Sequence, residues 1–82
     1  MSHDSHSQTA TLIKMVNQIA ANLSAYEPAE AAERIEQHLL RFWTPKMRHD
    51  LIDAAKDDTD ISPLARDAIQ RLQNLQIQKQ SA

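Results

Sequence analysis

The sequence of 82 residues contains no cysteine and no glycine. Without cysteine, the chain forms neither disulfides nor thiolate metal sites. Without glycine, it lacks the phosphate-binding loops of nucleotide-binding proteins, in which the backbone must approach the phosphate closely. The lack of glycine and of β-branched runs also disfavours tight hairpins and sheet. These absences argue against nucleotide-binding loops, cysteine-based redox chemistry and β structure.

Aromatic residues and long apolar segments are also scarce, with one Trp, one Tyr and one Phe in the chain. No run approaches the roughly 20 apolar residues that span a bilayer, and no secretory signal pattern occurs, so we expect a cytoplasmic protein without membrane contact. The net charge is −2 with mixed signs, whereas nucleic-acid binding favours a basic stripe. A chain this short buries only about 60% of its unfolded surface, which makes its own core marginal and a partner useful.

Three features resemble chemical sites but lack essential parts. His3, Asp4 and His6 could attract a metal, but a further fixed ligand is missing. The acidic run at 57–60 has neither the glycine nor the glutamate that an EF-hand loop requires. His38 has no nucleophile or acid at catalytic spacing, and we expect a partly buried histidine with a satisfied hydrogen bond. We therefore expect no catalytic, cofactor-binding or metal-binding residue in this chain.

What the sequence has in abundance is residues that favour helix: Ala, Gln, Leu and Glu. Apolar residues between Leu12 and Leu23 recur at helical spacing, which predicts a first helix starting at Thr9 or Thr11. The opposite face of this helix carries the amides of Asn17 and Gln18, which are either solvated or hydrogen-bonded to a partner.

The three prolines predict the starts of three further helices, because proline is tolerated at the first helical position. Thr44 before Pro45 and Ser62 before Pro63 supply N-capping hydroxyls, and Pro28 follows a turn. The expected fold is all-α, a compact bundle of four short helices with short connections. We divide the chain into a disordered tail (1–8), a helical domain (9–76) and a frayed tail (77–82).

The segment from Leu39 to Arg48 is the centre of the chain, because it holds the only Phe, the only Trp and three cations. At about 100° per residue, Phe42 shares the inner stripe of its helix and is predicted to fill the core. Trp43 lies at the edge of that stripe and Leu40 points away from it. Leu40 is therefore the predicted apolar surface that the domain does not cover, and Trp43 is either a second part of that surface or a core residue beside Phe42.

Two segments carry a resemblance to a known family. Residues 14–23 (KMVNQIAANL) and 38–48 (HLLRFWTPKMR) resemble the delta subunit of NAD-dependent formate dehydrogenase. The Phe-Trp-x-Pro-x-Met-Arg string is its most specific part, and Leu51 and the helix start at Pro63 also fit. The likeness covers about residues 12 to 75, with Leu23 at a position where the family commonly has Phe.

The resemblance implies a non-catalytic accessory subunit of a cytoplasmic molybdenum- or tungsten-dependent enzyme. Molybdopterin guanine dinucleotide, iron–sulfur clusters and FMN would then belong to partner subunits. This chain would dock on the catalytic (alpha) subunit, either as a permanent subunit or as an assembly factor. The predicted partner-binding residues are Asn17, Gln18, Leu40, Trp43, Lys46 and Arg48.

An alternative from another class is a self-associating helical regulator, a homodimer that binds nucleic acid. The acidic balance of the chain argues against the nucleic acid but leaves self-association in isolation open.

Overall fold

The structure, a computed structural model, describes the backbone of residues 3–57 and 60–81 and the side chains of residues 9–57 and 60–75. This part of the chain forms four helices and no strand. The helices are α1 (His3–Asn22), α2 (Pro28–Phe42), α3 (Pro45–Ala55) and α4 (Pro63–Ser81). The predicted all-α fold with short connections is confirmed.

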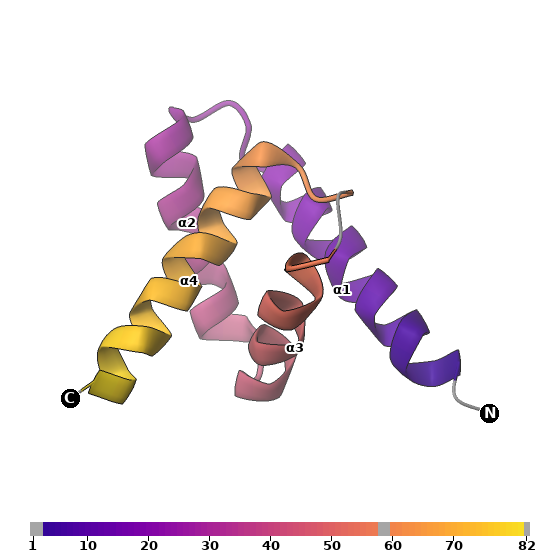
Figure 1. Ribbon diagram of the computed structural model, residues 1–82. Helices are drawn as coiled ribbons and strands as arrows, with labels where there is room; N and C mark the ends of the chain where they lie inside the picture. Colours follow the sequence, from indigo (N-terminus) through magenta and orange to yellow (C-terminus); the bar gives the residue numbers. More distant parts are fainter. Residues whose placement is uncertain (1–2, 58–59, 82) are drawn as a thin grey trace.

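The helices cross one another, and each contacts the other three. α1 and α2 run in opposite directions and diverge from the turn that joins them (Figure 1). α4 crosses α2, and this pair has the most extensive contact, while α3 lies between α4 and α1. The divergence leaves the C-terminal half of α2 incompletely covered by α1.

Each of the three prolines is the first residue of a helix, as predicted. At the start of α3, the backbone N–H of Met47 donates a hydrogen bond of 3.1 Å to the hydroxyl of Thr44. At the start of α4, the N–H of Ala65 donates to the Ser62 hydroxyl at 3.2 Å. Each cap satisfies a backbone donor that has no acceptor within its helix.

The limits of the outer helices differ from the prediction. α1 begins at His3 rather than at Thr9 or Thr11, and α4 continues to Ser81, past the end of its apolar stripe. Neither extension contains proline or glycine, so nothing in the sequence stops the backbone hydrogen bonding there. The predicted helix limits were too narrow, and the division of the chain into a domain and two tails stays a prediction.

The core is built from a few large side chains and many alanines. The largest fully buried side chains are Val16 on α1, Ile35 and Leu39 on α2, and Leu51 on α3. Small side chains let α2 and α4 approach closely. The buried alanines of these two helices are Ala31, Ala32, Ala65 and Ala68.

The position of Phe42 differs from the prediction, and Trp43 takes the core position, one of the two alternatives that the sequence left open. Trp43 is buried, with 6% of its surface exposed, whereas Phe42, predicted to fill the core, is 66% exposed. α2 ends at Phe42, but the N–H of Trp43 still donates to the Leu39 carbonyl at 3.0 Å, so Trp43 follows Leu39 on the buried side of the helix before the chain becomes extended (φ −98°, ψ 144°). The Trp43 side chain joins the core cluster with Leu39 and Leu51, and Leu40 packs half-buried against that cluster.

Candidate partner-binding surface

Arg48 closes the C-terminal end of α2. Its guanidinium Nη1 donates hydrogen bonds to the carbonyl oxygens of Trp43 at 2.6 Å and of Leu39 and Leu40 at 3.4 Å. A cation is favoured here because the last carbonyls of a helix lack partners and carry the negative end of the helix dipole. Arg48 is therefore a structural residue of the α2–α3 corner, whatever else it contacts.

Asn17 ties the connection before α4 to α1. Its amide nitrogen donates to the carbonyl of Asp60 at 2.7 Å, and its amide oxygen accepts from the N–H of Ser62 at 2.9 Å. Both ends of the amide are thus used within the chain, and they hold the residue that caps α4. The sequence predicts that the Asn17 amide is either solvated or bound to a partner. It does not predict the two hydrogen bonds of this amide to the connection before α4.

The other three predicted partner-binding residues lie at or near the surface. Gln18 is exposed and donates a hydrogen bond of 3.4 Å to Asn22 on the next turn. Lys46 is exposed and forms an ion pair of 2.7 Å with Asp50. Leu40 is half-buried. The six predicted residues therefore separate into a group engaged in folding (Asn17, Trp43, Arg48) and a group available at the surface, and their contact with a partner stays a prediction.

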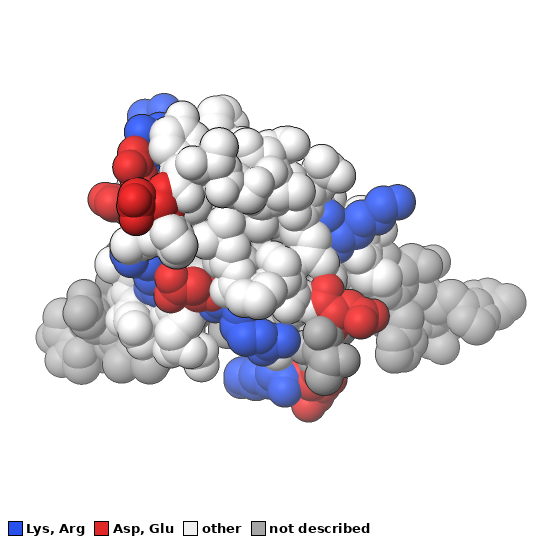
Figure 2. All heavy atoms as spheres, turned by 90° about the horizontal axis from the view of Figure 1, so that it is seen from above, with Lys and Arg blue, Asp and Glu red and all other residues white. Residues whose placement is uncertain are grey.

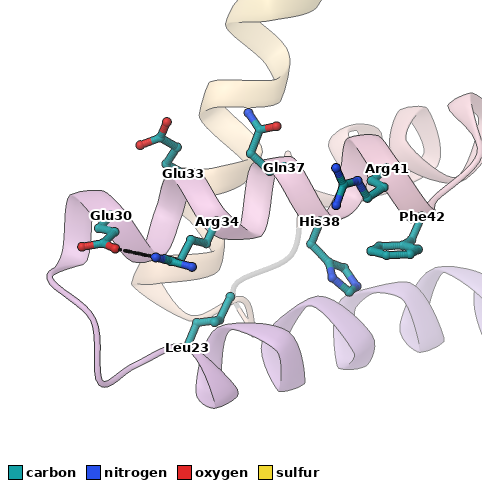
Figure 3. A pocket seen from close by; sticks show the side chains of 8 residues that line it. All are labelled: Leu23, Glu30, Glu33, Arg34, Gln37, His38, Arg41 and Phe42. Atoms are coloured by element: carbon teal, nitrogen blue, oxygen red, sulfur yellow. Dashed lines mark hydrogen bonds and ion pairs between the residues drawn. The ribbon is translucent and has the colours of Figure 1, made fainter.

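The structure reveals a surface that the sequence interpretation missed, an open groove of about 600 Å³ on α2 beside the C-terminal end of α1. We call it the α1–α2 groove. Figure 3 shows its lining residues, with His38 and Phe42 pointing toward α1 and with Glu33 and Gln37 on the other side of α2. The lining residues are Leu23, Glu30, Glu33, Arg34, Gln37, His38, Arg41 and Phe42.

One part of the groove is internally paired. Arg34 donates hydrogen bonds of 3.0 and 2.8 Å to the Glu30 carboxylate, one helical turn away. The Arg34 guanidinium also stacks on Tyr26, 4.2 Å from the ring centre. The hydrogen bond to Glu30 raises the pKa of Arg34 above its usual value, so the guanidinium stays charged. These contacts hold the turn before α2 against the helix.

The other part of the groove is apolar and cationic. The rings of His38 and Phe42 lie 4.8 Å apart at 45°. Arg41, next to them, makes no hydrogen bond or ion pair within the described residues. His38 is half-buried, as predicted, but its observed contact is this ring rather than the expected hydrogen bond.

Leu23 connects the groove to an apolar row on α1. Met15, Ile19 and Leu23 follow one another at four-residue spacing and therefore share a helix face. Met15 is 39% exposed, and the other two are half-buried against the core. The exposed apolar surface thus extends from Phe42 on α2 to α1.

Within the described residues, no three His, Cys, Asp or Glu side chains converge on a position for a metal ion. The side chains of His3, Asp4 and His6 lie outside the described set. None of the four helices, over its described residues, is both long and apolar enough to cross a membrane.

Comparison with protein families identifies the chain. Residues 11–69 match the family model of the NADH-dependent formate dehydrogenase delta subunit FdsD. The match spans most of α1, all of α2 and α3 and the start of α4, and so includes the corner and the α1–α2 groove. No curated protein and no solved structure matches the chain significantly. Since the family model covers more than half of the chain, this protein belongs to the formate dehydrogenase delta subunit family.

Proposed function

We propose that this chain is a non-catalytic accessory subunit of a cytoplasmic NAD-dependent formate dehydrogenase. It docks on the catalytic subunit and stabilises the complex or assists its maturation. The observation that carries the proposal, beside family membership, is the exposure of Phe42 in an open groove next to a completed core. Large aromatics that a small domain leaves in water are typical of protein–protein contact surfaces.

The chemistry of the groove supports a binding role rather than catalysis. Its acid–base residues are Glu30, held by Arg34, the nearby Glu33, and His38, which lies against a phenyl ring. A catalytic histidine needs a nucleophile or acid within hydrogen-bond reach. Under this proposal the molybdopterin guanine dinucleotide, the iron–sulfur clusters and FMN are held by the other subunits.

The proposal is tested by producing the enzyme with and without this chain. A tagged form of the chain is expected to retain the catalytic subunit through affinity purification and gel filtration. The preparation that lacks the chain is expected to contain less molybdenum or tungsten, or to lose formate-dependent NAD⁺ reduction faster on warming. A lower metal content indicates maturation, and faster heat inactivation at full metal content indicates stabilisation. Failure to co-purify, together with equal metal content and equal heat stability, would contradict both roles.

Self-association is the second candidate, because the same exposed apolar surface can be covered by another copy of the chain. Light scattering of the pure protein would detect a dimer. Binding of nucleic acid is less favoured. In the view from above, Lys and Arg lie beside Asp and Glu at the edges of the molecule, and the area between them carries no charged side chain (Figure 2). This face offers no continuous basic surface for a phosphate backbone.

A further inference from the structure

We propose that the α1–α2 groove is the docking surface for the catalytic subunit. Its occupant is a segment of that subunit that presents an apolar side chain next to a carboxylate. This inference rests on the proposed function and adds the surface and the chemistry of the contact. The sequence predicts an interface centred on the α2–α3 corner, and the inference places its centre at the groove instead.

The apolar half of the contact follows from Phe42. Phe42 is 66% exposed, and the centre of its ring lies 4.8 Å from that of His38. The core does not need it, because Trp43 already fills the corner between α2 and α3. Phe42 and Leu23 supply apolar surface in the groove, and the exposed Met15 lies on the same helical face as Leu23, two turns earlier. An apolar partner side chain on this surface would remove area from water without disturbing the fold.

The charge of the contact follows from Arg41. Arg41 lines the groove together with Phe42, and its guanidinium has no partner among the described residues. The nearby Arg34 is also cationic, but its charge is already paired with Glu30. Besides the hydrogen bond to Glu30, the charge of the remaining carboxylate, Glu33, also raises the pKa of Arg34, so both carboxylates act on the same cation. The groove therefore presents one cation without a partner among the described residues, Arg41, which a partner carboxylate complements in the bidentate geometry that arginine favours.

Corner residues are poorer candidates for the centre of the interface. Arg48 is occupied by three backbone carbonyls, and Lys46 is paired with Asp50. The Trp43 side chain contributes almost no surface. Contact at the corner would therefore have to break existing interactions, whereas contact at the groove can use Phe42, which is exposed, and Arg41, which has no partner among the described residues.

The test measures binding of the full chain to formate dehydrogenase purified from cells that lack this chain. Phe42→Ala and Arg41→Glu are each expected to weaken the dissociation constant about tenfold or more, as central aromatic and arginine residues of interfaces commonly do. Two controls are Gln70→Ala, at an exposed position of α4 outside the groove, and Lys56→Glu, an exposed cation after α3. Both controls are expected to bind as the unchanged chain does. Circular dichroism confirms that all four variants keep their helix content.

The possible results separate this inference from the proposed function. If the unchanged chain does not bind the enzyme, the proposed function fails and this inference fails with it. If the unchanged chain binds and both groove variants bind equally well, the groove is not the docking surface, although the accessory role stands. If Phe42→Ala abolishes a homodimer but leaves binding to the enzyme unchanged, the occupant is a second copy and the inference is overturned. Selective loss of binding in the two groove variants supports it.

Discussion

Phe42 and Trp43 are adjacent in the sequence and lie in opposite environments. Trp43 is 6% exposed and belongs to the core cluster, whereas Phe42 is 66% exposed and lies in the α1–α2 groove. Trp43 continues the row of buried side chains that runs through Ile35 and Leu39 at four-residue spacing, and Phe42 lies one residue off that row. One helix end thus supplies both an aromatic for the core and an aromatic for the surface.

The same division holds for the polar residues around the two aromatics. Beside Trp43, Arg48 and Thr44 are hydrogen-bonded to the backbone and fix the corner. Beside Phe42, Arg41 has no partner among the described residues. The corner is therefore a folding element and the groove a surface with unused contacts. Substitutions at the corner should therefore lower the free energy of unfolding, and substitution of Phe42 in the groove should not.

Replacing Trp43 with alanine is expected to have the largest effect. Removing a buried aromatic leaves a cavity and lowers the free energy of unfolding by about 3–5 kcal/mol. For a small domain this is a large part of the total stability, so the variant should be partly or wholly unfolded. Urea denaturation followed by circular dichroism measures the change. A loss below about 1 kcal/mol, typical of a surface position, would place Trp43 outside the core.

Arg48→Met is expected to lower the free energy of unfolding by about 1.5–3 kcal/mol, since it removes a charged donor from the carbonyls at the end of α2 and keeps the apolar stem. Lys46→Met is the matched control, because its exposed ion pair with Asp50 contributes only about 0.3–0.5 kcal/mol. Equal effects of the two substitutions would mean that the Arg48 contacts do not hold the corner. Urea titrations of both variants make the comparison.

Asn17→Ala is expected to cost about 1–2 kcal/mol, because it breaks both hydrogen bonds that tie the connection before α4 to α1. Gln18→Ala, which removes a weaker contact on the exposed side of the same helix, should change stability by less than about 0.5 kcal/mol. Hydrogen exchange at the start of α4 should rise in the first variant only. Unchanged protection there would show that Asn17 does not anchor this helix.

Much of the fold follows from local sequence. Pro45 with Thr44, and Pro63 with Ser62, mark helix starts through backbone chemistry that acts within one turn, and the structure has both. The family also follows from a local string around Phe42. Such signals need no knowledge of how the helices are packed.

The positions of the two aromatics could not be predicted in this way. A buried row on α2 at four-residue spacing passes through Ala31, Ile35 and Leu39 and continues to Trp43, whereas a step of three from Leu39 leads to Phe42. Spacings of three and of four residues both occur on one face of a helix. Which of the two aromatics is buried depends on where α2 ends and on how α1 diverges from it.

The roles of Asn17 and Arg48 also depend on the packed structure. Asn17 binds residues that are 43 and 45 positions further along the chain. Arg48 reaches back across the corner to the preceding helix. Their residue types allow solvated, partner-binding and structural roles alike, so only the packed helices distinguish these roles.

The measurement that tests the account most directly is the effect of Phe42→Ala on two quantities, the stability of the chain and its affinity for formate dehydrogenase that lacks it. A residue that is 66% exposed should contribute less than about 0.5 kcal/mol to folding. The account predicts an unfolding curve close to that of the unchanged chain and binding weakened about tenfold or more. A large loss of stability with unchanged affinity would contradict it, because Phe42 would then belong to the core and the groove would not be the docking surface.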